Sequence, residues 1–481
     1  MIMKRTIFIL FFFSIWSITY AQTSANKNDT IKLVVLAVND QHAKIDNYGQ
    51  LKAAVDQIRS QYDNVLLLSG GDNFTGNPVV DQYSDKGYPI IDLMNIVGFN
   101  ASAVGNHEFD YGQEILNKRM EQAKFPFLSA NIKNQDGTKN AFKPYNDFEL
   151  NGLKVTVIGA IQLGNAGLPD SHPSNLKGLS FKDGVDELLN YKNLKENCNV
   201  FIALTHIGFE EDVRLAEQMP ELDLIMGGHT HTLTKPSHNV NGVYIMQSGS
   251  NVRNLSKAII SLVNGKVVKI NTEMLNLADF KSTDRIIEEK LAYYNDNKEL
   301  NQIIGTSLVP IKGSDELGSL MTDAVTSLPE VEVAFQNNGG IRIDALAKGP
   351  ITVKDIYKLD PFGNEIILFR MSPKEIKSLI FNAYKDAGDE IDLQVSGLTY
   401  TINSHKGYSL NSVELKWPNG KKIKQCKKIN VGLNSYIASS YKFDHEDSGR
   451  SLFVTTAEIL IQYIKDKKEI EYNNIRRAFK K

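Results

Sequence analysis

Cysteine is nearly absent from this chain. Among its 481 residues only Cys198 and Cys426 occur, and neither has a CxxC partner or the spacing of a metal ligand. This scarcity excludes a disulfide-dense secreted scaffold and a thiolate-based metal site. The two thiols lie in parts of the chain that we assign to different domains, so we expect two free, buried thiols rather than a disulfide.

Neither sign of charge is in excess. The 54 basic and 56 acidic residues leave a formal net charge of -2, and there is no long basic tract. A nucleic-acid partner, which would need a basic surface, is therefore not expected. With 42% hydrophobic and 23% charged residues, the composition is that of an ordinary globular protein. Its length suits about two or three domains.

Long apolar runs are also missing, except at the N-terminus. Lys4 and Arg5 precede an apolar run over 7–18, and the short segment 19–21, which ends in alanine, follows it. This order predicts a secretory signal peptide over residues 1–21 and export to the periplasm or the medium. The run is shorter than the roughly 20 residues of a membrane span, so we expect no stable span after cleavage. An uncleaved anchor is the alternative.

The region from 30 to 275 alternates apolar strand-like runs with helical ones. Its runs of Val, Ile and Leu are typical of strands buried on both faces of a sheet. The predicted strands cover residues 31–38, 64–70, 102–105, 125–132, 154–161, 199–206 and 222–228. The clearest predicted helices cover 49–62 and 183–193. We therefore predict a layered α/β domain, with antiparallel pairing near its end.

The composition changes between residues 276 and 303. This stretch is charged, lacks glycine and proline, and has apolar residues at helical spacing, which predicts a connecting helix. A second, smaller α+β domain is expected over 304–475, with apolar runs of its own. We expect the tail after about residue 475 to be frayed.

Polar residues follow the predicted strands of the first domain at the points where the strands end. Five of the nine histidines stand at these ends, and they are His42, His107, His206, His229 and His231. Because ligands bind beyond the carboxyl ends of strands in open α/β sheets, we expect these side chains to converge in space.

The residue types at the strand ends suit a pair of divalent metal ions. Imidazole and carboxylate ligands suit Zn, Mn or similar ions, and thiols are lacking. A carboxylate such as Asp72 can bridge two ions about 3.5–4 Å apart. In the pairs Asp40–His42 and His229–His231 the two residues point the same way in an extended segment, so both can reach one site.

Five short motifs, taken in order, resemble those of the calcineurin-like metallophosphoesterases. They are Asp40-x-His42, Gly71-Asp72-Asn73, Gly105-Asn106-His107-Glu108, Thr205-His206 and Gly228-His229-Thr230-His231. The longer forms SGGDNFTGNP (69–78) and GNHEFDYG (105–112) resemble the 5′-nucleotidase branch of that family. The resemblance implies an α/β/β/α metallophosphoesterase domain over 30–275, a linker over 276–303 and a 5′-nucleotidase C-terminal domain over 304–475.

The resemblance also implies roles for these polar residues. One metal ion would be held by Asp40, His42, Asp72 and His231, and the other by Asp72, Asn106, His206 and His229. His107 would face the phosphate oxygens as a cation, with Asp110 holding its ring in the needed tautomer. Glu108 is expected to be structural, as a partner of a helix N-terminus.

In the second domain the resemblance implies a nucleoside clamp of planar and polar side chains. Its members would be Asn337, Arg342, Phe362, Asn364 and Tyr436. Arg342 offers a planar donor fork for phosphate or ribose oxygens, and Phe362 and Tyr436 would stack on the base. The segment 434–447 departs from the family because its usual GGDGF is missing, which leaves the polar contact to the base or ribose open.

These expectations describe an exported hydrolase of nucleotide catabolism. A site with two metal ions would release phosphate from nucleoside 5′-monophosphates by attack of a metal-bound hydroxide, while the second domain clamps the nucleoside. The first alternative is the same metal chemistry on nucleotide sugars, 2′,3′-cyclic nucleotides or another phosphate or sulfate ester. The second alternative is a non-catalytic nucleotide-binding protein.

Overall fold

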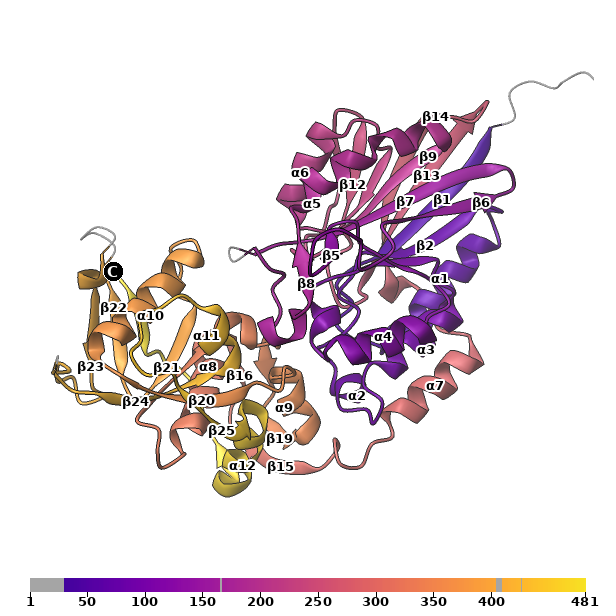
Figure 1. Ribbon diagram of the computed structural model, residues 1–481. Helices are drawn as coiled ribbons and strands as arrows, with labels where there is room; N and C mark the ends of the chain where they lie inside the picture. The colour runs from indigo at the N-terminus through magenta and orange to yellow at the C-terminus, as the bar shows by residue number, and fades with distance from the viewer. Residues whose placement is uncertain (1–29, 165–166, 404–408, 425) are drawn as a thin grey trace, which may run out of the picture.

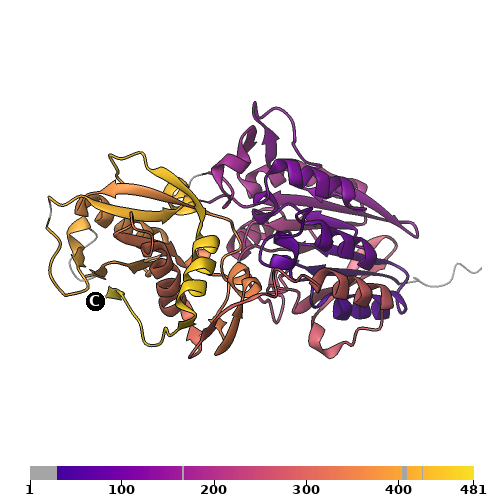
Figure 2. The same ribbon diagram turned by 90° about the horizontal axis from the view of Figure 1, so that it is seen from below.

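A computed structural model describes residues 30–164, 167–403, 409–424 and 426–481. Figures 1 and 2 show two domains side by side, the first running from β1 to α7 and the second from β15 to β27. The predicted signal peptide, residues 1–21, lies outside the described residues. Within the described ranges no helix combines the length and the apolar character needed to cross a membrane.

The first domain contains two six-stranded sheets. One has the order β14 (Lys266–Asn276), β13 (Asn254–Val263), β1 (Ile31–Val38), β2 (Val65–Ser69), β3 (Ala101–Ala103) and β4 (Phe127–Leu128). The other has the order β11 (His238–Val240), β12 (Val243–Met246), β10 (Leu224–Met226), β9 (Val200–His206), β7 (Leu153–Ile161) and β6 (Tyr145–Leu150). Strands β1 to β4 are parallel to one another, and so are β7, β9, β10 and β12.

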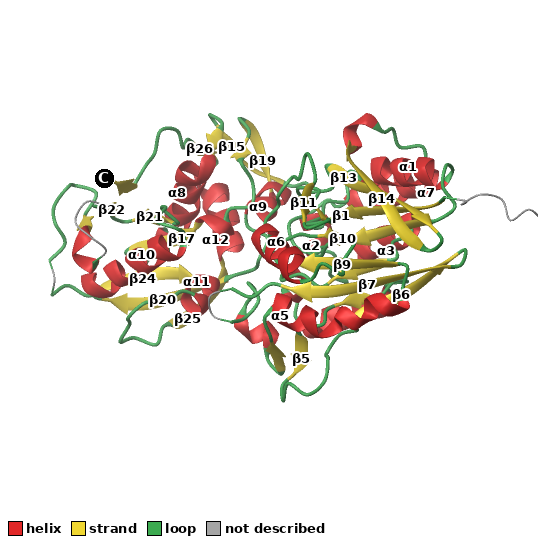
Figure 3. Ribbon diagram, turned by 90° about the horizontal axis from the view of Figure 1, so that it is seen from above, coloured by secondary structure: helices red, strands yellow, loops and turns green. Residues whose placement is uncertain are grey.

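Alternate residues of β1 face two different cores. Val34 and Leu36 belong to the core between their sheet and its helices, whereas Leu33 and Val35 belong to the core between the two sheets. This alternation is the period of two that an extended strand imposes. It confirms the predicted α/β/β/α layering, which Figure 3 shows from the edge.

Helices cover the outer face of each sheet. The first sheet is covered by α1 (Tyr48–Arg59), α3 (Tyr88–Val97), α4 (Gln113–Gln122) and α7 (Arg285–Asn295). The second sheet is covered by α5 (Gly184–Leu188) and α6 (Phe209–Gln218). The helix predicted over 183–193 is only partly α-helical, because a 3-10 helix continues α5 over Leu189–Asn197.

The strand predicted over 125–132 is broken. The chain forms β4 and then β5 (Ile132–Asn134), which pairs with β8 (Leu179–Phe181) outside the two main sheets. The break has a local cause in Asn131. Its Oδ1 accepts from the backbone N–H of Ile161 at 2.9 Å, and its Nδ2 donates to the carbonyl of Ile161 at 2.8 Å. The side-chain amide of Asn131 thus makes the hydrogen bonds to Ile161 that a strand backbone would otherwise make.

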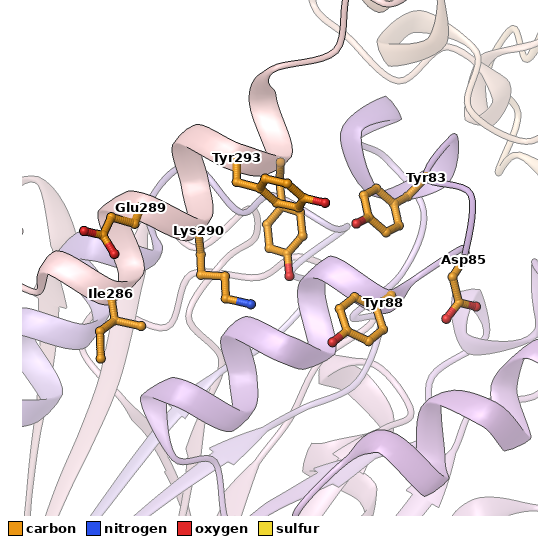
Figure 4. A pocket seen from close by; sticks show the side chains of 8 residues that line it. Tyr83, Asp85, Tyr88, Ile286, Glu289, Lys290 and Tyr293 are labelled. Atoms are coloured by element: carbon orange, nitrogen blue, oxygen red, sulfur yellow. The ribbon is translucent and has the colours of Figure 1, made fainter.

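The connecting helix α7 packs on the first domain. Ile287 and Leu291 enter its core, and Asp92 on α3 accepts from Tyr294 Oη at 2.6 Å and pairs with Lys290 Nζ at 2.8 Å. Figure 4 shows the open pocket that remains beside this contact, with tyrosine rings from α7 and from the loop before α3 around it. The helix ends at Asn295, and the short segment 296–302 connects it to the second domain. In this segment Leu300 is buried in the core of the first domain, and its carbonyl accepts from the backbone N–H of Lys354 at 2.8 Å.

The second domain is built on a five-stranded sheet. Its order is β21 (Leu393–Ser396), β17 (Val333–Asn337), β24 (Ile429–Asn434), β20 (Glu365–Met371) and β25 (Arg450–Thr455). Helices α8 (Gly313–Thr326) and α10 (Pro373–Asp386) pack beside the sheet, and a three-stranded sheet forms around β15 (Ile303–Ser307). Helix α9 (Val353–Leu359) contacts α2 (Pro78–Asp81) of the first domain.

Two expectations are wrong, one about the tail of this domain and one about the burial of the two cysteines. The tail is not frayed, because β27 (Ala478–Lys480) pairs in parallel with β22 (Thr399–Ile402). The cause is Arg477, whose Nη1 and Nη2 lie 2.6 and 2.9 Å from the two carboxylate oxygens of Asp323 on α8. Cys198 and Cys426 are free, as predicted, but Cys426 is exposed and Cys198 is only half-buried.

We predict that Arg477→Ala destabilises the second domain by about 1–3 kcal/mol, since the partly buried Asp323 loses its charged partner. Arg476→Ala is the matched control, because Arg476 lies 3.5 Å from Asp315 on the exposed surface and contributes little. Urea unfolding measures the free energy of unfolding of both variants. Equal midpoints for the two variants would contradict the role given to the Asp323 pair.

Candidate active site

The carboxyl ends of five strands open at one edge of the first domain. Strands β1, β2 and β3 come from one sheet, and β9 and β10 come from the other. The loops that follow them carry the polar residues singled out in the sequence. Within the described part of the chain, three overlapping groups have the spacing of metal ligands, and they are Asp40–His42–His231, His42–Asp72–His107 and Asp72–His206–His229. With Asn106 included, we describe them as two ligand groups that meet at Asp72.

The first ligand group consists of Asp40, His42, Asp72 and His231. The Nε2 atoms of His42 and His231 lie 2.9 Å apart, and His231 Nε2 lies 3.3 Å from Asp40 Oδ1. The ring nitrogen of His42 also lies within 4.8 Å of a carboxylate oxygen of Asp72. Two imidazole nitrogens aimed at each other beside two carboxylates are arranged as ligands of one cation would be.

The second ligand group consists of Asp72, Asn106, His206 and His229. His206 Nε2 lies 3.1 Å from Asp72 Oδ2 and 3.2 Å from Asn106 Oδ1. His229 Nδ1 lies 3.1 Å from the same Asn106 oxygen. The amide oxygen is therefore the point at which the two rings of this group meet.

The donor atoms of both groups fit divalent metal ions. Ligands about 2.0–2.2 Å from one ion are separated from each other by roughly 3 Å, which is the spacing found in both groups. Imidazole nitrogens with carboxylate and amide oxygens are a donor set for first-row ions such as Zn or Mn. Asp72 belongs to both groups, so its carboxylate is placed to contact two ions.

Outer hydrogen bonds set the tautomers of two of the rings. His206 Nδ1 donates to the Gly70 carbonyl at 2.7 Å, and His42 Nδ1 donates to the Thr75 carbonyl at 3.1 Å. A carbonyl only accepts, so each Nδ1 carries the proton, which directs each Nε2 toward its ligand group. Burial opposes the charged form of His206, but Asp72, whose Oδ2 lies 3.1 Å from Nε2, outweighs it and raises the pKa of His206 to about 10.

Burial keeps two of the rings neutral. Burial and the nearby Arg342 guanidinium hold the pKa of His42 well below its usual value. Burial and the His206 ring lower the pKa of His229 to about 4. Neutral imidazole is the form that binds a metal ion.

His107 and Asp110 form a hydrogen-bonded pair at the rim of the two groups. His107 Nδ1 lies 2.6 Å from Asp110 Oδ2, and Ser171 Oγ donates to the other oxygen of Asp110 at 3.2 Å. Burial opposes the charged form of the ring, but Asp110 and Asp72 outweigh it and raise the pKa of His107. The other ring nitrogen lies 3.9 Å from Asp72 Oδ2, so the ring borders the point where the two ligand groups meet.

The loops that carry the ligands are strained. Positive φ angles, which disfavour side chains other than glycine, occur at Asp40 (50°), His42 (47°), Asp72 (53°), His229 (83°) and His231 (54°). Such conformations persist only where the surroundings fix them. Backbone hydrogen bonds from Asp40 to Gly71 and from His42 to Asp72 hold the first loop. Two buried carboxylates, to which the sequence motifs did not assign this role, support the loops after β2 and β10.

Glu108 joins the two loops that follow β2 and β3. Its side chain is fully buried and accepts hydrogen bonds from the backbone N–H groups of Asp72, Asn73 and Gly105 at 3.0, 2.6 and 2.6 Å. The expectation that it serves a helix N-terminus is wrong, although its structural character holds. A carboxylate has several acceptor positions, so one residue can satisfy three backbone donors that have no strand partner.

Asp212, on α6, supports the loop after β10. It accepts from Thr205 Oγ1 at 2.6 Å and from Gln247 Nε2 at 2.8 Å, and Gln247 Oε1 accepts from Thr230 Oγ1 at 3.2 Å. Burial raises the pKa of Asp212 to about 7. The network holds Thr230 between the two ligands His229 and His231. Sequence reasoning missed it because Asp212 and Gln247 belong to none of the five motifs.

Arg342 and Phe362 reach the ligand groups from the second domain. Arg342 Nη2 donates toward His42 Nε2 at 3.4 Å, and the guanidinium lies 5.5 Å from the centre of the Phe362 ring. Phe362 in turn stacks on His107, with ring centres 5.8 Å apart and an angle of 20° between the planes. Two of the predicted clamp residues therefore contact residues of the candidate metal site itself.

The other three predicted clamp residues lie on or around α11 (Ser435–Ser440). Asn337 Oδ1 accepts from Asn434 Nδ2 at 3.0 Å, and Asn364 Oδ1 accepts from Ser435 Oγ at 3.0 Å. These amides hold the start of the helix that carries Tyr436. Burial and the carboxylates of Asp170 and Asp110 raise the pKa of Tyr436.

The altered segment 434–447 uses its aspartates elsewhere. Asp447 accepts from the backbone N–H of Arg370 at 2.7 Å and of Gly449 at 3.0 Å. The backbone of Asp444 donates to Ser378 Oγ at 3.2 Å. The Asp447 carboxylate is thus engaged within the second domain and does not replace the aspartate missing from the GGDGF segment.

Comparison with known proteins agrees with this architecture. Residues 33–233 match the family model described as calcineurin-like phosphoesterase, and residues 303–442 match the 5′-nucleotidase C-terminal domain. A 5′-nucleotidase of Vibrio cholerae is 29% identical over 448 residues, which cover 78% of this chain and 80% of the relative.

Two solved structures extend the comparison. The 5′-nucleotidase precursor of Thermus thermophilus superposes with a TM-score of 0.82 at 25% identity, covering 94% of this chain and 99% of that one. The sulfate thiohydrolase SoxB of Thermus thermophilus superposes with a TM-score of 0.76 at 18% identity, covering 93% of this chain and 96% of that one. The second likeness is one of fold alone.

We predict that Glu108→Gln lowers the free energy of unfolding by roughly 1–3 kcal/mol, since an amide N–H₂ would face backbone N–H donors that need an acceptor. The amount of metal bound per protein should also fall, because the loops that carry Asp72 and Asn106 lose their shared support. Thermal unfolding and elemental analysis measure the two effects. Glu114→Gln is the control, as Glu114 is exposed and pairs only with Lys118 on the surface. If the two variants behaved alike, the role of Glu108 would be wrong.

Proposed function

This chain belongs to the 5′-nucleotidase family of metal-dependent phosphoesterases, and we propose that it removes the 5′-phosphate from nucleoside monophosphates with the help of two divalent ions. The observation that carries the proposal is the junction at Asp72. Two ligand groups share this residue, His107 borders both, and Arg342 of the second domain reaches them.

The residues of each ligand group would hold one ion, Zn, Mn or a similar metal. Bound there, the two ions would acidify a water molecule and neutralise phosphate charge. One site would be formed by Asp72 with Asp40, His42 and His231. The other would be formed by Asp72 with Asn106, His206 and His229.

His107 would stabilise the charge that develops on the phosphoryl oxygens. Asp110 holds the Nδ1 proton of the ring at 2.6 Å, which leaves the Nε2 side of the ring toward Asp72 and the space over the ligand groups. A cation fixed in this position needs no reorganisation as the reaction proceeds, which is what makes such groups effective.

Arg342 would bind the phosphate from the opposite side. Its side chain is half-buried, and the guanidinium offers several donors in one plane, which suits phosphate oxygens. Phe362 and Tyr436 are the aromatic rings available to stack on a base. Because Phe362 rests on His107, stacking there requires the second domain to shift, and segment 296–302 is where we propose that it hinges.

The alternative substrates remain nucleotide sugars, 2′,3′-cyclic nucleotides and other phosphate or sulfate esters. The observation that favours them is the altered segment 434–447, in which the carboxylate of Asp447 accepts from the backbone N–H of Arg370 in the second domain. A non-catalytic nucleotide-binding role is less consistent with two complete ligand groups. The N-terminal pattern of residues 1–21 further supports export to the periplasm or the medium.

We predict that purified protein binds two divalent ions and that chelation abolishes phosphate release from AMP until Mn²⁺ or Zn²⁺ is restored. His107→Asn should lower kcat about 10²–10³-fold, the loss found when one charge-stabilising donor is removed, while metal content is unchanged. His238→Asn, at an exposed position of β11, is the control. Phosphate release and elemental analysis are the measurements. Loss of metal from the His107 variant would show that its role is misassigned.

A second variant separates substrate binding from metal binding. Arg342→Lys keeps the charge but loses the planar donor fork, so KM for AMP should rise about 10-fold or more with both ions retained. Arg370→Lys, at an exposed position on β20, is the matched control. Kinetics on AMP, a nucleotide sugar and a 2′,3′-cyclic nucleotide compare the substrates. An unchanged KM on all three would remove Arg342 from the substrate site.

A further inference from the structure

The segment around Asp170 passes beside the second ligand group, although no sequence motif includes it. It follows β7, whose carboxyl end opens at the same edge as those of β9 and β10. Asp170 makes two different approaches to this group, one through its backbone and one through its side chain.

The backbone carbonyl of Asp170 orients the Asn106 amide. It accepts from Asn106 Nδ2 at 3.0 Å. The two ends of an amide differ, since one only donates and the other only accepts. With Nδ2 held by Asp170, Asn106 Oδ1 is turned toward His206 Nε2 at 3.2 Å and His229 Nδ1 at 3.1 Å. The opposite orientation would present N–H groups to the ion.

The carboxylate of Asp170 faces the outer nitrogen of His229. Its Oδ2 lies 3.9 Å from His229 Nε2, while Nδ1 of the same ring faces the ligand group. His206 and His42 have carbonyl oxygens in the corresponding place. A carboxylate there would keep the proton on Nε2 and leave the Nδ1 lone pair for a metal ion. The gap of 3.9 Å is one that a water molecule or a small movement of the loop closes.

Gln162 offers a means of holding that carboxylate. It is the first residue after β7, it is buried, and its backbone N–H donates to the His206 carbonyl at 2.8 Å. Its side chain lies beside Asp170, and Nε2 has no hydrogen-bond partner of normal geometry among the described residues. A buried donor without a partner is costly, so a nearby carboxylate is its natural acceptor.

We propose that Asp170 is a positioning residue of the second ligand group, which orients Asn106 through its backbone carbonyl and His229 through its carboxylate. The inference rests on the proposed function, because it requires this group to hold an ion. The Asp170 side chain is 48% exposed, so its replacement leaves no cavity in the core. Substitution also keeps the backbone carbonyl, which isolates the contribution of the carboxylate.

The test measures metal binding without substrate. Metal-free protein is titrated with Mn²⁺ by calorimetry, and with Co²⁺ by visible absorption, which reports the ligand geometry. Wild type should bind two ions. Asp170→Asn should bind one ion as wild type does and the second about 10–100-fold more weakly, the usual cost of losing an outer carboxylate partner of a ligand. Asp170→Glu should recover most of that affinity, since its longer side chain still reaches His229.

Asp186→Asn is the matched control, since Asp186 is an exposed carboxylate that lies 3.5 Å from Arg214. It should bind both ions as wild type does. Wild-type affinity for both ions in Asp170→Asn would overturn the inference and leave the proposed function standing. Fewer than two ions in the wild type would overturn both. Equal weakening of both ions, with no recovery in Asp170→Glu, would indicate a general effect of charge and would also overturn the positioning role.

Discussion

The candidate active site depends on one buried carboxylate. Glu108 accepts the backbone N–H groups of Asp72, Asn73 and Gly105, and so joins the loops that leave β2 and β3. Asp72, which belongs to both ligand groups, adopts a positive φ that it would not keep in an isolated loop. The three hydrogen bonds of Glu108 offset this strain at the residue on which the whole arrangement converges.

The fold supplies the remaining constraints by bringing strand ends to a single edge. Parallel pairing of β1, β2 and β3 aligns their carboxyl ends, and the second sheet does the same for β7, β9 and β10. Because the sheets pack face to face through an apolar core, the two rows of loops meet at that edge. Ligands more than a hundred residues apart in sequence therefore lie about 3 Å from each other, as Asn106 and His229 do. Residues distant in sequence can therefore form one site because the packing of the two sheets brings their loops together.

The sequence predicted the layers of the first domain and the polar residues that gather at its edge. It also predicted both ends of β1 correctly. These features carry local signals, since buried strands read as apolar runs and their ends as polar motifs. Glu108 was placed in the right region with the wrong partner, because nothing in GNHEFDYG shows which backbone donors need an acceptor. Asp170, Asp212 and Gln247 were missed for a related reason, as their roles arise from contacts between distant segments. The strand breaks at Asn131 because its side-chain amide makes the hydrogen bonds that a neighbouring strand backbone would make. The hydrophobic pattern of the sequence does not show this contact.

The docking of α7 on the first domain has a consequence for how the two halves of the site meet. Only the seven residues from Asp296 to Gln302 join α7 to β15. Leu300 packs in the core of the first domain, and the carbonyls of Leu300 and Gln302 accept from the backbone N–H groups of Lys354 and Val353 at the start of α9. A connection this short and this well bonded keeps the second domain against the first, so Arg342 and Phe362 are held beside the two ligand groups without a search through solution.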